Sequence, residues 1–370
     1  MALIKTNSRS LSPDTAFGLQ PKNLLINGAM DVCQRTGHQP ATVEANVISG
    51  SNGVRIDRWN VGGSGSSGID TSIMYHENTN FTNFKNAMRF NVSAESSSLA
   101  TNDYVYAQQR IEAKNVINRL NYGQSGAKKL TLSFWIYSNV TGKYGVSLIN
   151  RKDTSSYRRR NIMSYTINAA NTWEKKVITF VGDTDTNFGF DLTKATTHPY
   201  LGVAWHFAAG TSRVASASTD YSSEGVWYTD SNKNVEYLSC DGQTNAFTST
   251  SNDIYLTGCQ LEIGEDATEF EHRHHSQTLN DCYRYLYVYM EDHDVGDNLP
   301  GRLYSSRYSS AGAMIHLFYP CVMYRQPTKT YGEAGGAVSS DYSSSGHLQL
   351  YDSDDTAWRI YNLVADAEIG

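Results

Sequence analysis

Two stretches of this sequence place aromatic and polar side chains on one face of a predicted strand. In residues 130–137 apolar and polar residues alternate, so Trp135 and Tyr137 lie opposite an apolar stripe. Residues 104–111 alternate in the same way and gather four more side chains on one face, Tyr104, Tyr106, Gln108 and Arg110. Aromatic rings can stack on the C–H face of a sugar while amide and guanidinium groups bind its hydroxyls. If both faces line one concave sheet, these side chains form a glycan-binding site; the alternative is a face covered by loops or by a neighbouring subunit.

A cluster of histidines could bind a metal. His272 and His274 lie in a polar stretch that continues with His275. In a trimer such a pair would direct several imidazoles towards the axis, where they could hold a transition metal. The alternative is a solvated hinge beside acidic residues. The five cysteines show no Cys-x-x-Cys spacing, which supports neither a zinc site nor a disulfide framework, and we expect no cofactor.

Acidic pairs could supply the carboxyl groups of a glycosidase, and two occur, at Glu265-Asp266 and Asp354-Asp355. Adjacent residues of a strand point to opposite faces, so neither pair makes a catalytic couple. The sequence also lacks a nucleophile elbow, a phosphate-binding loop and a His-Glu-x-x-His motif. We therefore expect no enzymatic activity, although distant carboxylates could still make the chain a polysaccharide depolymerase.

Composition excludes other classes of function. Charged residues make up 18% of the 370 residues and the net charge is -6, without the basic stripe that nucleic-acid binding needs. No apolar run approaches the length of a membrane span, so we expect no membrane insertion. The first residues lack the apolar core of a signal peptide. The number of cysteines is odd, which suits assembly in a reducing cytoplasm.

Short alternating segments separated by Gly, Asn, Asp and Ser clusters predict a mainly β protein. We expect a jelly-roll β-sandwich followed by a small C-terminal antiparallel β domain. The predicted division is an extended N-terminal arm at 1–21, the jelly roll at 22–275, a helical joint at 276–284 and the C-terminal β domain at 285–370. Two short helices are predicted, at Ala113–Leu120 and at Gln277–Arg284 with Ser276 as its N-cap.

Several short motifs follow one another in order over residues 22–285. They are Asn23–Met30 with Cys33–Arg35, Ile56–Trp59, Leu130–Ser138 with Gly142–Tyr144, Thr172–Glu174, Ile254–Arg273 and Cys282–Tyr285. Their order and spacing resemble the tail-fibre and virion structural proteins of bacteriophages. The opening Asn23–Gly28 and the closing strand near Ile254 also resemble bacterial carbohydrate-binding modules of jelly-roll fold.

These resemblances imply a place in a phage virion, assembled in the host cytoplasm. The implied function is a tail-fibre or receptor-binding type subunit, a homotrimer that contacts other phage tail proteins and recognises a glycan on the host surface. One alternative is a purely structural virion subunit, such as an adaptor, nozzle or decoration protein; the depolymerase is the second. The related modules often hold a structural calcium near their first and last strands. Here Thr257-Gly258 stands where those modules often carry paired acids, so calcium is only an open alternative.

Overall fold

A computed structural model describes most of the chain. The described residues are 21–44, 47–48, 53–78, 81–151, 158–189, 200–230, 238–289, 302–304, 306–309, 312–334, 338–352 and 359–367. The predicted arm at 1–21 therefore lies almost wholly outside the described residues, as does Asp354-Asp355. Among the described residues, no helix is both long enough and apolar enough to cross a bilayer.

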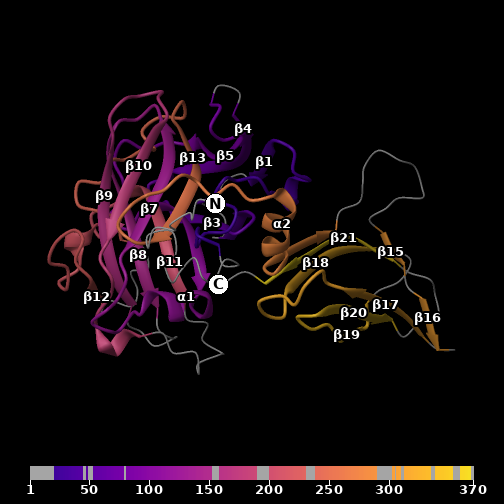
Figure 1. Ribbon diagram of the computed structural model, residues 1–370. Helices are drawn as coiled ribbons and strands as arrows, with labels where there is room; N and C mark the ends of the chain where they lie inside the picture. The colour runs from indigo at the N-terminus through magenta and orange to yellow at the C-terminus, as the bar shows by residue number, and fades with distance from the viewer. Residues whose placement is uncertain are drawn as a thin grey trace, which may run out of the picture.

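Two antiparallel sheets form the larger unit of the protein, drawn in indigo to orange in Figure 1. The six-stranded sheet has the order β1 (Ala41–Glu44), β4 (Asp70–Glu77), β5 (Asn86–Ala94), β13 (Asp253–Ile263), β7 (Leu130–Ser138), β10 (Glu174–Phe180). The seven-stranded sheet has the order β12 (Tyr228–Asp230), β9 (Arg158–Ile167), β8 (Gly142–Arg151), β11 (Tyr200–Ala209), β6 (Tyr104–Glu112), β3 (Trp59–Ser64), β2 (Gly53–Ile56). A mainly β jelly-roll sandwich is confirmed.

The space between these sheets is filled by the apolar stripes that alternation predicts. Phe134 of β7 is fully buried and meets Trp205 of β11 at a ring-centroid distance of 5.7 Å. Trp205 in turn packs against Trp59 of β3 at 5.4 Å. Because side chains alternate along a strand, burial of one stripe leaves the other stripe of each strand on the outer face of its sheet.

Two smaller sheets form the C-terminal unit and enclose an apolar core of their own. One consists of β14 (Leu286–Tyr289), β21 (Arg359–Asp366) and β15 (Arg302–Tyr304), with β18 (Thr328–Ala334) also paired to β21. The other has the order β16 (Ser306–Ser309), β17 (Gly312–Phe318), β20 (His347–Asp352), β19 (Ser340–Asp341). Their pairings are antiparallel, as predicted for this part of the chain.

Both predicted helices are present. Helix α1 covers Ala113–Leu120, the range that the sequence predicts. Helix α2 covers His275–Tyr283 and lies between the sandwich and the C-terminal sheets (Figure 1). Its N-cap is His274, whose side chain accepts from the Ser276 amide, so the prediction of Ser276 as the cap is wrong by two residues.

A polar network joins the two units. The Gln34 side-chain amide donates to Asp57 Oδ2 at 2.6 Å and to the Leu286 carbonyl at 2.8 Å, and its oxygen accepts from the Val288 amide at 3.1 Å. Gln34 thus connects a fully buried carboxylate of the sandwich to the backbone of β14, a strand at the edge of its sheet.

Candidate functional site

The structure separates the two groups of predicted sugar-binding residues. Trp135 and Tyr137 lie on the outer face of the six-stranded sheet, because β7 belongs to that sheet. The other group, Tyr104, Tyr106, Gln108 and Arg110, lies on β6 of the seven-stranded sheet. The condition that both groups line one sheet is not met, so they do not form one site.

Most of the β6 group is also inaccessible. Tyr106, Gln108 and Arg110 are all buried, while Tyr104 is half-buried. Arg110 donates to the Gln108 side chain at 3.0 Å, and its guanidinium lies 4.8 Å from the centre of the Tyr200 ring. Alternation predicted correctly that these side chains share a face, but it does not show that this face is covered.

The outer face of the six-stranded sheet carries a cluster of half-buried rings that extends well beyond the predicted pair. We call this cluster the aromatic face; it consists of Phe81, Trp135, Tyr137, Trp173 and Tyr255. Tyr137 meets Tyr255 at 5.2 Å and Trp173 at 5.7 Å between ring centroids. The rings leave aromatic and hydroxyl groups at the surface, which is the composition that sugar binding requires.

Three of these rings were not among the predicted site residues, although two had a signal in the sequence. Tyr255 alternates with Ile254 and Leu256 in the closing strand, so its outward direction follows from period two. Trp173 stands in the motif Thr172–Glu174. Phe81 lies in the connection between β4 and β5, where alternation gives no information.

A glycine positions the centre of the aromatic face. At Gly258 the β13–β7 register shifts in a β-bulge, and the backbone has φ +59°. A Cβ there would lie 2.5 Å from the Phe84 ring and 3.0 Å from Trp135 Cδ1. Glycine is therefore needed both for its positive φ and for the close approach of two aromatic side chains.

A carboxylate positions the turn that carries Trp173. Glu174 Oε1 accepts from the amides of Asn168 and Ala169 at 2.8 and 2.9 Å. Burial alone would raise the pKa of Glu174, but the Lys176 ammonium and these amides outweigh burial and lower the pKa to about 2. The charged form of Glu174 therefore holds the turn at neutral pH.

The charged groups Arg89 and Asp253, at the Tyr255 end of the aromatic face, are paired. Arg89 binds Asp253 through two hydrogen bonds, of 2.9 and 2.8 Å, and its guanidinium lies 5.5 Å from the centre of the Tyr255 ring. His76 packs on Tyr255 at 5.1 Å, and burial, with the nearby Arg89, lowers the pKa of His76. The imidazole is therefore neutral at neutral pH, and this end of the face has donors and acceptors without net charge.

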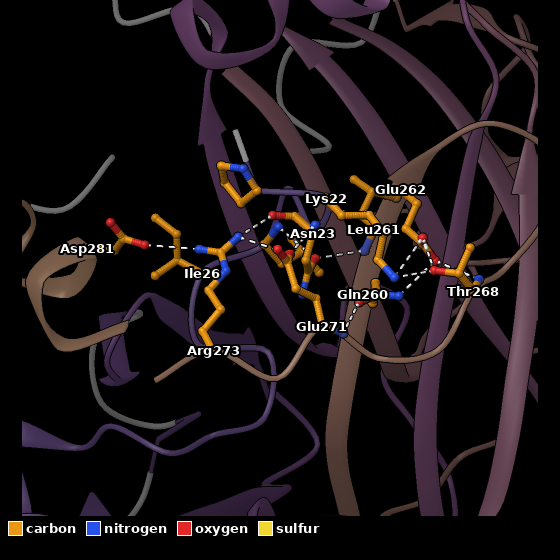
Figure 2. Close-up of polar contacts among 12 residues, drawn as sticks. Lys22, Asn23, Ile26, Gln260, Leu261, Glu262, Thr268, Glu271, Arg273 and Asp281 are labelled. Carbon is orange, nitrogen blue, oxygen red and sulfur yellow. Dashed lines mark hydrogen bonds and ion pairs between the residues drawn. The ribbon is translucent and has the colours of Figure 1, made fainter. Parts of the chain in front are cut away.

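Figure 2 shows the seam between the first described residues and the closing strand β13. The Lys22 ammonium donates to the Thr268 hydroxyl and to the Glu269 carbonyl, the latter at 2.7 Å, and lies 3.7 Å from Glu262. Glu262, nearly buried, also accepts from Thr268 and from the Gln260 side chain. Calcium needs six to eight oxygen ligands. The two carboxylates of this seam already accept from other groups, Glu262 from Thr268 and Gln260 and Glu271 from the Asn23 amide, so these residues do not form an open calcium site. Calcium bound elsewhere stays a prediction.

The histidines proposed for a metal have separate roles. His272 packs on Phe84 and Phe270, with ring centroids 5.6 and 4.9 Å apart. His274 Nδ1 is 2.8 Å from the Ser276 hydroxyl and caps α2. Within the described part of a single chain, no three His, Cys, Asp or Glu side chains gather as metal ligands. A metal held between three subunits stays a prediction.

A pocket of about 350 Å³ lies at the joint, away from the aromatic face. Arg273 lines this pocket and contacts Asp281 at 3.0 Å and the Asn23 carbonyl at 2.9 Å, as Figure 2 shows. Glu112 accepts from Arg284 at 2.6 and 3.0 Å. Burial would raise the pKa of Glu112, but these bonds lower it. Both pairs link segments that meet at the joint.

Comparison with known proteins shows no family for this chain. No protein-family model and no curated protein matches the sequence. A family 4 carbohydrate-binding module is similar at 10% identity and TM-score 0.31, over 64% of this chain and 97% of that one. A family 11 carbohydrate-binding module from Clostridium thermocellum, solved with a β-1,3-1,4-mixed-linked tetrasaccharide, is similar at 11% identity and TM-score 0.27, over 63% and 100%.

A third similar structure is the enzymatically active domain of tailspike protein 4 of bacteriophage CBA120, at 9% identity and TM-score 0.30. The similarity covers 65% of this chain, and this chain spans 21% of the tailspike chain. Likenesses at this level do not show what this chain binds, which has to be argued from its own residues.

Proposed function

We propose that this chain recognises glycans through the aromatic face. The observation that carries the proposal is the cluster of half-buried rings on the outer face of the six-stranded sheet, bordered by the paired Arg89 and Asp253. Core packing does not require these rings, because the apolar stripe of β7 already fills the space between the sheets. Rings at a surface beside fixed donors and acceptors are the means by which proteins hold sugars.

We propose binding without cleavage. Glycoside hydrolysis commonly uses two carboxyl groups on either side of the bond. Two carboxylates border the aromatic face among the described residues: Arg89 binds both oxygens of Asp253, and Glu174 accepts from the Asn168 and Ala169 amides and pairs with Lys176. A carboxylate in such a pair is held as a structural acceptor and is poorly placed to act as acid or nucleophile.

The wider role that we propose is a receptor-binding type subunit of a phage virion, a homotrimer that contacts other tail proteins and a host-surface glycan. The ordered motifs support the virion part of this proposal. A purely structural virion subunit is the second candidate. A specific observation favours it: Gln34, Asp57 and Arg284 belong to those motifs and lie in the joint between the two units. The motifs thus serve the architecture as much as a binding face.

A glycan array of bacterial surface polysaccharides tests the proposal. We expect the wild-type protein to bind, and the double substitution of Tyr137→Ala with Tyr255→Ala to weaken binding at least about tenfold, because the loss of about 1.4 kcal/mol of ring contact already corresponds to that factor. The control is Tyr342→Ala, which removes a ring that is 60% exposed in the C-terminal unit. No binding by the wild type, or equal binding by the double variant at an unchanged melting temperature, would contradict the proposal.

A further inference from the structure

The aromatic face is ordered as a row that runs across the strands. Arg89 of β5 pairs with Tyr255 of β13, which pairs with Tyr137 of β7. Trp173 comes next, because the following residue, Glu174, pairs with Ile136. Three of these positions lie on neighbouring strands, and Trp173 immediately precedes the fourth strand, β10. Neighbouring strands are about 4.8 Å apart, so the row spans about 14 Å. That length exceeds a single pyranose ring.

The members of the row are evenly spaced. Successive distances are 5.5 Å from the Arg89 guanidinium to the Tyr255 ring centre, 5.2 Å from Tyr255 to Tyr137, and 5.7 Å from Tyr137 to Trp173. Each step is comparable with the advance of one sugar along an extended chain. The row can therefore offer one contact to each of several consecutive sugars.

The rings of the row are not coplanar. Tyr137 and Tyr255 are inclined at 87°, and Trp173 is inclined at 49° to Tyr137. A crystalline polysaccharide presents a flat plane of sugar rings, which needs a coplanar platform on the protein. Rings inclined to one another instead suit a soluble chain in which each sugar is rotated relative to the last.

The Arg89 end of the row also has no net charge to offer. Asp253 holds the Arg89 guanidinium in a two-bond pair, and both side chains are about three-quarters buried. A charged sugar would have to compete for a partner that is already bound. The hydroxyl groups of an uncharged sugar can bind the donors and acceptors at the exposed edge of the Arg89–Asp253 pair without breaking it.

We infer that the row binds an internal stretch of an extended, soluble and uncharged glycan, lying across the strands from Arg89 to Trp173. This inference rests on the proposed function. It adds that a chain, and not a single sugar, a chain end or a crystalline surface, is recognised.

The test uses fragments, graded by length, of the polysaccharide that binds best on the array. Competition by these fragments should strengthen at least about tenfold from the monosaccharide to the tetrasaccharide, then level off once the row is filled. Trp173→Ala removes one end of the row, so it should weaken binding of the tetrasaccharide more than binding of the disaccharide, and competition should level off at a shorter fragment. Tyr255→Ala, at the centre, should weaken binding of every fragment.

The outcomes separate the two proposals. If nothing on the array binds, both fail. If the array binds and the monosaccharide competes as well as the tetrasaccharide, glycan recognition stands and the extended row is wrong. Binding that weakens steeply as NaCl is raised would overturn the uncharged ligand, because screening acts on charged contacts. A uniform loss with Trp173→Ala at all lengths would show that Trp173 only supports the fold.

Discussion

At the scale of single residues, Gly258 combines a backbone conformation that favours glycine with close packing against two aromatic rings. Gly258→Ala should lower the free energy of unfolding by more than the roughly 1 kcal/mol that a positive φ costs, because the new methyl group would press on Phe84 and Trp135. The matched control is Gly37→Ala. Gly37 has the same φ of +59° but no atom within 4 Å of a new Cβ.

Urea unfolding of both variants, followed by tryptophan fluorescence, separates the two contributions. The Gly37→Ala loss reports the backbone cost alone, and the additional loss at Gly258 reports the collision with the rings. Equal losses for the two variants would mean that Phe84 and Trp135 move aside without cost and that the bulge does not fix their positions.

Glu174 gives a pH dependence at the same scale. Its pKa falls on folding from the usual 4.5 to about 2, so its contribution to stability is complete above pH 4.5 and is lost as the pH falls towards 2. The stability difference between wild type and Glu174→Gln should therefore be greatest near neutral pH and shrink through that window. Denaturant titrations at a series of pH values measure it, with Glu265→Gln, at the exposed end of the same sheet, as the control. A difference that stays constant down to pH 2 would contradict the role of the charged form.

At the scale of elements, the seam between Lys22 and β13 places an ammonium group 3.7 Å from the buried Glu262 carboxylate. Lys22→Met should cost about 1 kcal/mol, a modest value because the Lys22 side chain is 41% exposed. Wild-type melting should be the same in CaCl₂ and in EDTA. Lys128→Met, at an exposed lysine, is the control. A melting temperature that drops in EDTA would show that a divalent cation is bound after all.

The alternation of apolar and polar residues predicted the strands and the direction of their side chains better than it predicted which strands pair with one another. Period two placed Leu130 and Phe134 inwards and Trp135 and Tyr137 outwards, and the structure agrees. It could not predict that Tyr137 pairs with Tyr255, because register between strands distant in sequence is set by turns and packing outside either strand. Nor could it separate the outer faces of the two sheets, since β6 and β7 show the same pattern while belonging to different layers.

At the scale of the whole molecule, motifs that are far apart in the sequence converge at the joint. Gln34, Asp57 and Arg284 come from three of them, and none lies on the aromatic face. Asp57 is fully buried; burial raises its pKa even though Gln34 donates to both carboxylate oxygens. A buried acceptor of this kind is costly to leave without donors, so the network fixes how the C-terminal sheets sit on the sandwich.

Gln34→Ala should uncouple the two units. The substitution removes one side-chain donor from Asp57 and the whole side-chain link to Leu286 and Val288, for a loss of about 2–3 kcal/mol. Because each unit has its own apolar core, we expect calorimetry to resolve two unfolding transitions for this variant and one for the wild type. Gln39→Ala, at an exposed glutamine in the same segment, should leave a single transition. A single, unshifted transition for Gln34→Ala would mean that the remaining contacts, such as the 3.0 Å ion pair between Arg35 and Asp366, already suffice to hold the units together.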